Sequence, residues 1–570
     1  MNVPFYPIQT AADVMAMLDQ SDMPERRKRD LTSAINRVCE MIGYPPAALK
    51  LDVPTLRAQI GVIRSAAHGI SQKTFANLRS LFGVAMEWAG VIERLPRGAA
   101  RRDSAWAPLA AAVAGDKQLA NGLAAFLNWC AWTGVEPASV DDKVLQRFLH
   151  WREARTLHSR PRDVVRQIPA LWAAAQVLVP DWPATQLTRI SFRAVSLNLR
   201  WEDLPESLRT DAEAYLTARA APDLFDDSQD APTRPLVPST IRQPAEHIRL
   251  AASVLVRHGI AAEELNGLTA LVEIDAVTTV LRHYHEQAAR KPNAFAVAIG
   301  RTLIHIARYH VRVTDEQLQR LKRTAAKLPA IPFDLTSKNK TLLAELENEA
   351  VRVRLLSLSE ALMREVNNSL RDGRRLKFVE AQVAAAIDIL LLAPLRPQNL
   401  IELNFSRNFR EPEGSRGKLV IYIPKDATKT KRRDLTFEVP PELAETIRWY
   451  RREIPPRLGG NPNGDLFVSE GGGRKSQETL SQQLTETIAE KVGIHMTPHQ
   501  FRHLAAVLYL EAHPEDFQTV SDLLGHSFAK TTLVYAGSSS RRASRAYGNL
   551  VIEQRQAAAL KQRRPRRRTK

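Results

Sequence analysis

The chain has 570 residues, of which 44% are hydrophobic and 25% are charged, so it is long enough for three or four globular domains with ordinary buried cores. Lys and Arg number 80 and Asp and Glu number 62, which gives a net charge of +18 and predicts a polyanionic partner. Nucleic acid is favoured over a membrane surface, because no apolar run approaches the roughly 20 residues of a membrane span.

The two cysteines, Cys39 and Cys130, lie far apart and form no CxxC pair. This argues against a disulfide framework and a zinc site, and it is typical of a reducing compartment. Residues 1–7 lack the charged and apolar segments of a signal peptide. We therefore expect a cytoplasmic protein that associates with the DNA of the nucleoid.

Residues 10–330 show helical periodicity with little of the alternation that is typical of strands. Three segments share one pattern, in which an amphipathic helix ends at a glycine and a short turn-forming stretch opens the next helix. They are 41–49, 132–140 and 257–265, and a further apolar helix is expected after each, at 75–88, 164–172 and 295–309. Any helix–glycine–turn–helix segment looks similar, so coincidence is the alternative to a repeated module.

The composition also divides the chain. We predict helical modules at 1–100, 101–220 and 238–332, a linker at 221–237, a larger domain at 335–555 and a basic tail at 556–570. The linker is acidic and rich in proline, residues 97–104 separate the first two modules, and residues 329–340 are the expected hinge.

In the 335–555 domain, an apolar helix leads to Arg396 within residues 390–403. Residues 419–424 and 435–439 alternate like strands and flank a basic connection, which predicts a β-hairpin. The expected fold class is therefore mainly α, with a small β-hairpin or sheet in this last domain.

A capping box with proline at the first helical position is formed by Thr497, Pro498 and Gln500, so a helix is expected to begin at Thr497. His499 then lies in the first turn, and Arg502 shares its helix face. Because the N–H groups of a helix start favour anions, this arrangement predicts a phosphate site.

A second helix is expected at 517–524 and ends at Gly525, which leaves His526 on a turn, and Tyr535 follows nine residues later. Taken singly, each motif is more often a helix surface, a helix end or a core ring. Together, an arginine, two histidines and a tyrosine suit attack of a tyrosine hydroxyl on a phosphodiester without a metal.

These motifs resemble the signature of the tyrosine recombinase, or phage integrase, family, which has an HxxR box, an LLGH box about two dozen residues on and a tyrosine nine residues after its histidine. Here His526 follows Arg502 by 24 residues and Tyr535 follows His526 by nine. The 390–403 segment resembles the first arginine box of the family, and the hairpin resembles the one that carries the catalytic lysine.

The resemblance implies an enzyme, a site-specific DNA recombinase or integrase of a mobile element, which breaks and rejoins DNA strands through a 3′-phosphotyrosyl intermediate and uses no cofactor or metal. Tyr535 would attack the phosphate, Lys429, with Lys431 as the alternative, would protonate the leaving 5′-hydroxyl, and His499 would assist. The residues implied to hold the phosphate oxygens are Arg396, Arg502 and His526. The chain departs from the family pattern at Pro394, where the family has glycine, and at Asn399, where it has an acidic residue.

The helical modules resemble the core-binding module that the family places before its catalytic domain, and the 238–332 module is expected to clamp double-stranded DNA. Its expected phosphate contacts are Arg301, His305, Arg308, Arg320, Lys322 and Arg323. The resemblance also implies a homo-oligomer, a tetramer on DNA, and the enlarged N-terminal half is consistent with companion recombinases. No membrane partner is expected.

Two other functions fit the sequence. A type IB topoisomerase-like enzyme shares the arginine, lysine and tyrosine chemistry and differs in lacking strand exchange between two sites. A DNA-binding accessory protein with weak catalysis, within a system of several recombinases, is favoured by the altered surroundings of Arg396 and opposed by the full set of catalytic residue types.

Overall fold

The computed structural model describes residues 8–192, 198–222, 235–236, 238–332, 334–411, 418–428, 433–525 and 551–555. Its described part is mainly helical with one small sheet, as predicted. The chain divides into two compact units, one from Ser191 to Phe333 and the other made of the chain up to Ile190 and from Asp334 onward. None of the helices in the described ranges is both long and apolar enough to cross a membrane.

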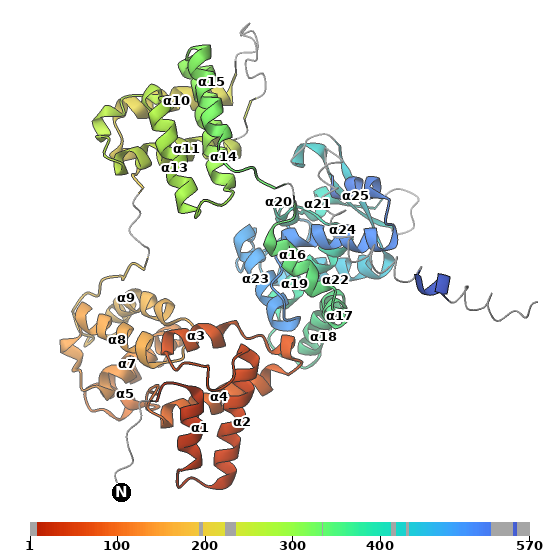
Figure 1. Ribbon diagram of the computed structural model, residues 1–570. Helices are drawn as coiled ribbons and strands as arrows, with labels where there is room; N and C mark the ends of the chain where they lie inside the picture. The colour runs from red at the N-terminus through yellow and green to blue at the C-terminus, as the bar shows by residue number, and fades with distance from the viewer. Residues whose placement is uncertain are drawn as a thin grey trace, which may run out of the picture. The chain divides into compact units, whose positions relative to one another are not determined.

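Residues up to Ile190 form two helical modules, each around its own apolar core (Figure 1). The first contains α1 (Ala11–Asp19), α2 (Glu25–Ile42), α3 (Val53–Val62), a 3-10 turn (Ser65–His68) and α4 (Gln72–Trp88). The second contains α5 (Ala99–Arg102), α6 (Ala107–Ala112), α7 (Lys117–Trp132), a 3-10 turn (Pro137–Ser139), α8 (Asp142–Arg155) and α9 (Pro161–Leu178). Side-chain oxygens cap the first N–H groups of several of these helices, at Thr10, Asp52, Ser71, Asp116 and Asp141.

The repeated pattern of the sequence has a common backbone form. Gly43, Gly134 and Gly259 all adopt left-handed φ values, of 84°, 70° and 97°, which confirms that a helix ends at each of them. Residues 97–104, which we expected to separate two modules, instead contain α5. Its Ala100 is buried, and the Ala100 N–H donates to the Asn128 side chain of α7 at 3.0 Å.

Two side chains join the N-terminal modules into one body. The Arg57 guanidinium on α3 donates to the carbonyl oxygens of Glu153 and Thr156 at 2.5 and 2.7 Å, at the end of α8. The Glu93 carboxylate accepts from the indole N–H of Trp151 at 2.7 Å. Helix ends leave carbonyl oxygens without partners inside the helix, so Arg57 acts as a C-terminal cap supplied by the neighbouring module.

The unit from Ser191 to Phe333 is a helical bundle (Figure 1). It contains a 3-10 turn (Trp201–Asp203), α10 (Glu206–Ala220), α11 (Pro238–Arg257), a 3-10 turn (Ala262–Glu264), α12 (Leu268–Val272), α13 (Ile274–Gln287), α14 (Ala294–Ile306), a π-helical turn (Ala307–Val311) and α15 (Asp315–Ala326). The sequence placed 101–220 in a separate module, whereas α10 contributes Leu208, Ala212 and Tyr215 to the core that is shared with α11–α15.

One expected phosphate contact in this unit has a different environment. The Nδ1 atom of His305 lies 3.1 Å from the hydroxyl of Tyr215, and burial lowers the pKa of His305 to about 4. The His305 ring is therefore neutral at pH 7 and bonded to a core tyrosine, so it offers no positive charge to a DNA phosphate. Arg301, Arg320, Lys322 and Arg323 are exposed.

The C-terminal part begins inside the expected hinge at residues 329–340, because residues 337–340 already belong to the first helix, α16. Its helices are α16 (Ser337–Leu346), α17 (Glu349–Leu356), α18 (Leu358–Arg371), α19 (Phe378–Leu392), α20 (Pro397–Ile401), α21 (Phe405–Asn408), α22 (Pro441–Arg457), α23 (Gln477–Lys491), α24 (Phe501–Ala512) and α25 (Phe517–Leu524), with 3-10 turns at Lys425–Ala427 and Pro498–Gln500. The sheet has the order β1 (Phe409–Arg410), β2 (Leu419–Ile423) and β3 (Leu435–Val439). The predicted hairpin is confirmed, because β2 and β3 pair antiparallel from Leu419 with Val439 to Ile423 with Leu435.

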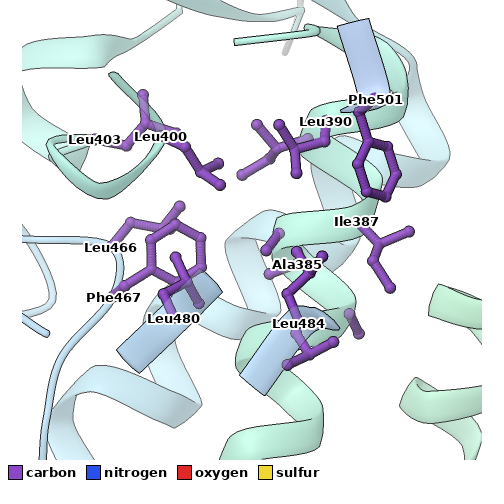
Figure 2. Packing of buried hydrophobic residues seen from close by; sticks show 14 of the residues in the cluster. Ala385, Ile387, Leu390, Leu400, Leu403, Leu466, Phe467, Leu480, Leu484 and Phe501 are labelled. Carbon is purple, nitrogen blue, oxygen red and sulfur yellow. The ribbon is translucent and has the colours of Figure 1, made fainter. Parts of the chain in front are cut away.

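The buried helix α19 organises this part of the chain. Figure 2 shows Ala385, Ile387 and Leu390 of α19 facing side chains from α20, α23 and α24, among them Leu400, Leu484 and Phe501. Apolar burial contributes about 25 cal/mol for each Å² removed from water, so this core holds the surrounding helices against α19. The ends of α19, α24 and α25 carry or adjoin the residues that the sequence singled out for catalysis.

Candidate active site

Arg396 lies between α19 and α20, as the N-terminal cap residue of α20. Pro397 at the first helical position fixes the backbone there, and the buried Ala393 and Leu395 hold the preceding segment against the core. The Arg396 side chain is half-buried, and burial lowers the pKa of its guanidinium. It stays charged at neutral pH, because the ordinary pKa of arginine lies above about 12.

Arg502 is buried in the first turn of α24, with 5% of its surface exposed. Its guanidinium donates to the carbonyl oxygen of Pro394 at 2.7 Å and to that of Leu524 at 2.5 Å. Pro394 precedes Arg396 by two residues and Leu524 precedes His526 by two. Arg502 therefore ties together the two segments that lead into Arg396 and His526, and it brings a buried charge to their junction.

The expected start of the HxxR helix is confirmed, with a 3-10 first turn before the α-helix. The Thr497 N–H donates to the Gln500 side chain at 2.9 Å, as in the predicted capping box, and the Thr497 hydroxyl donates to the same side chain at 3.1 Å. His499 is exposed in that first turn, and Arg502 is buried on the same segment. The His499 imidazole and the Arg502 guanidinium thus belong to one helix start, whose N–H groups favour anions.

A polar contact that the sequence did not predict supports this segment. Asn339 of α16 donates to Nε2 of His503 at 2.9 Å and accepts from the Gln500 amide at 3.1 Å. Burial, and then the charges of His499 and Arg502, lower the pKa of His503 to about 4, so its ring is neutral at pH 7. Through Asn339, helix α16 is bonded to residues on both sides of Arg502 in the sequence, Gln500 and His503.

Three predicted site residues, Lys429, His526 and Tyr535, and the alternative Lys431, lie outside the described residues. The chain is described up to Thr428, again from Arg433, and up to Gly525. Gly525 ends α25 in the left-handed conformation with φ of 58°, as predicted from its position. Thr428 is buried, so the residue immediately before Lys429 in the connection between β2 and β3 is packed in the protein.

The bond from Arg502 to Pro394 joins the start of α24 to the segment that leads into Arg396, and His499 precedes Arg502 by three residues. In the described ranges, no group of three or more His, Cys, Asp or Glu side chains has an arrangement that could hold a metal ion. The positive charge of the described site residues comes from the guanidinium groups of Arg396 and Arg502. It suits electrostatic stabilisation of a phosphate by guanidinium and imidazole groups.

Residues 359–542 match the model of the phage integrase family. Two of the similar curated proteins are tyrosine recombinases XerC. The protein from Mannheimia succiniciproducens is 29% identical over 171 residues, which cover 30% of this chain and 53% of the relative. The protein from Chromohalobacter salexigens is 34% identical over 88 residues, which cover 15% of this chain and 28% of the relative. The chain thus spans about a quarter to a half of the length of these relatives.

Among solved structures, the XerH site-specific recombinase bound to a palindromic difH substrate has a TM-score of 0.37 at 18% identity, over 54% of this chain and 79% of that one. An integrase from mycobacterium phage Brujita has a TM-score of 0.22 at 14% identity, over 60% of this chain and 92% of that one. The family model covers the segment that contains Arg396 and Arg502 and the positions of Lys429, His526 and Tyr535. Residues 359–542 thus form a domain of the phage integrase, or tyrosine recombinase, family.

Proposed function

We propose that this protein is a site-specific DNA recombinase that cuts and rejoins duplex DNA through a 3′-phosphotyrosyl intermediate on Tyr535. The proposal rests on the buried guanidinium of Arg502, which donates to main-chain carbonyl oxygens in the segments that lead into Arg396 and His526. A buried charge held by main-chain carbonyls is fixed before substrate arrives, and such preorganised charge stabilises a transition state most effectively.

In the first step, the Tyr535 hydroxyl attacks the scissile phosphorus, and the bond from phosphorus to the 5′-oxygen breaks. Tyrosine has an ordinary pKa of about 10, so its proton has to pass to a nearby base, for which His499 is the candidate. Lys429 gives a proton to the departing 5′-oxygen. The phosphodiester is exchanged for a phosphotyrosyl ester, so the bond energy is retained and rejoining is the same reaction run backwards with a second 5′-hydroxyl.

The charge distribution supports duplex DNA as the partner. A net charge of +18 favours a polyanion, and Arg301, Arg320, Lys322 and Arg323 are exposed on the unit that precedes the family domain. These charges supply affinity without sequence preference, so binding should weaken steeply with salt. We further propose that a tetramer performs strand exchange on DNA within the cytoplasm, where the protein is bound to the nucleoid.

Covalent trapping tests the proposal. Wild type and Tyr535→Phe are incubated with labelled, nicked duplexes tiled from the DNA that flanks the gene, and the products are separated under denaturing conditions. We expect a protease-sensitive shifted band with wild type only, and equal DNA binding by both proteins. A covalent band with Tyr535→Phe would refute the assignment.

A second assay separates the recombinase from its two alternatives. Two copies of the trapped site are placed on one plasmid, and recombinant products are scored by their length. Recombinants support the proposal. Relaxation of supercoils without recombinants would favour the topoisomerase-like enzyme, and salt-sensitive binding without any covalent band would favour the accessory protein.

A further inference from the structure

The connection between β2 and β3 is fastened at its first end to the helix that Arg396 begins. Asn399 lies in α20, three residues after Arg396, and only 6% of its surface is exposed. Its side-chain N–H donates to the carbonyl oxygen of Ala427 at 2.8 Å. Ala427 precedes Lys429 by two residues, so a buried amide of α20 fixes the chain where it approaches that lysine.

Local bonds make this first end rigid. The Thr428 hydroxyl donates to the carbonyl oxygen of Lys425 at 2.7 Å, and Thr428 is 3% exposed. The Lys425 N–H donates to the Asp434 carboxylate at 2.7 Å, which closes the base of the connection from one strand to the other. The backbone at Thr428 therefore has few ways to move relative to α20.

The second end of the connection is fastened to a different helix. The Arg433 guanidinium donates to the Asp522 carboxylate at 2.5 Å and to the carbonyl oxygen of Ser521 at 3.2 Å. Both acceptors lie in α25, which ends at Gly525, immediately before His526. The Arg433 and Asp522 side chains are 44% and 46% exposed, so this pair adds little to stability, and its main effect is orientation.

We propose that Asn399 and Arg433 are positioning residues for general acid catalysis, holding the two ends of the lysine-bearing connection to the helices that adjoin Arg396 and His526. The inference rests on the proposed function, because it assigns the proton donor to that connection. A general acid must come within about 2.6–3.2 Å of the atom it protonates, and an error of about 1 Å can cost on the order of 10²-fold in rate. Fixing both ends of a short connection limits that error.

The inference explains why the chain has Asn399 where the family has an acidic residue. An amide N–H can donate to the Ala427 carbonyl oxygen, whereas a carboxylate only accepts and would face that oxygen with a negative charge. The substitution Asn399→Asp restores the family residue. It is nevertheless expected to release the first end of the connection.

The test compares two leaving groups. Single-turnover cleavage is measured for Asn399→Asp, Asn399→Ala and Arg433→Ala on the trapped duplex, made either with its normal 5′-oxygen or with sulfur at that bridging position. A thiolate leaves without a proton, so the sulfur substrate does not need the general acid. Matched controls are Gln398→Ala, an exposed neighbour of Asn399 on α20, and Arg457→Ala, an arginine with its own surface ion pair.

We expect each positioning variant to cleave the oxygen substrate about 10- to 100-fold more slowly than wild type and the sulfur substrate at close to the wild-type rate, while both controls match wild type on both substrates. Equal slowing on both substrates would overturn the inference, because it would mean a general loss of folding or of phosphate binding. An unchanged rate on the oxygen substrate would overturn it as well. Failure of the proposed function itself would be distinguishable, because wild type would then cleave neither substrate or Tyr535→Phe would cleave both.

Discussion

Arg502 shows how one side chain can organise a site through the main chain. Its guanidinium presents N–H donors in a planar fork, and two of them reach the carbonyl oxygens of Pro394 and Leu524. The family pattern has glycine in place of Pro394, yet a carbonyl oxygen is available at either residue. The departure therefore leaves the bond between Arg502 and the segment before Arg396 intact.

Replacing Arg502 with lysine keeps the charge and removes the fork. A lysine ammonium is a compact point charge that cannot bond both carbonyl oxygens in this geometry. We expect Arg502→Lys to lower the single-turnover cleavage rate by about 10²- to 10³-fold while DNA affinity changes little. The measurement is covalent complex formation at saturating protein, with DNA binding measured in parallel. Cleavage within a few-fold of wild type would show that charge alone is required.

His503 makes the stability of the C-terminal part depend on pH. Burial lowers the pKa of His503 to about 4, below the value of about 6.5 in an unfolded chain. As the pH falls, the unfolded chain therefore binds a proton at His503 before the folded protein does. The contribution of neutral His503 to the free energy of unfolding is complete above pH 6.5 and is lost as the pH falls toward 4.

We expect His503→Gln, which still offers an acceptor to Asn339, to lose less thermal stability than wild type between pH 7.5 and pH 5. For each kcal/mol of pH-dependent stability that the substitution removes, the drop in melting temperature between the two pH values should become smaller by about 2–4 °C. Thermal melts at the two pH values measure this difference. Parallel losses in the two proteins would contradict the neutral, bonded state of His503.

At the scale of helices and strands, local signals in the sequence predicted the elements that carry the site. The capping box at Thr497, the glycine that ends α25 and the alternation of β2 and β3 all act between near neighbours, so they can be read from the sequence. The contacts that position those elements join distant residues. Asn339 bonds His503, 164 residues away in the sequence, and Arg433 bonds Asp522, 89 residues away. Sequence periodicity does not predict such pairs.

Arg57 gives an element-scale prediction in the N-terminal body. It donates to carbonyl oxygens at the end of α8, so Arg57→Ala would leave partly buried acceptors without their donor. We expect a local destabilisation of roughly 1–3 kcal/mol. Hydrogen exchange of peptides that cover residues 142–156 should become faster. The exposed Arg101→Ala is the control, and equal exchange in both variants would show that Arg57 does not cap α8.

At the scale of the whole molecule, composition and motif order indicated several helical modules followed by the family domain, but the position of one boundary required the structure. Leu208, Ala212 and Tyr215 of α10 are at most 4% exposed in the core with α11–α15. The acidic, proline-rich stretch made residues 221–237 look like a boundary between domains. Burial instead assigns the helix before that stretch to the unit that follows it.

Two fragments test this assignment. Residues 198–332 contain the complete core and should unfold cooperatively in urea. Residues 238–332 lack α10, so they should expose the apolar surface that α10 covers and lose cooperativity. The measurement is the helical circular dichroism signal against denaturant concentration. Equal stability of the two fragments would place the boundary at residue 238, as the sequence predicts.

The central claim concerns one bond, the ester between Tyr535 and a 3′-phosphate. The covalent complex trapped on a nicked duplex is digested with nuclease and trypsin, and the residual nucleotide is located by mass spectrometry. Trypsin should release residues 531–541, in which Tyr535 is the only tyrosine. We expect this peptide to carry the nucleotide through a 3′-phosphate on Tyr535. A nucleotide on any other residue, or a link through a 5′-phosphate, would contradict it.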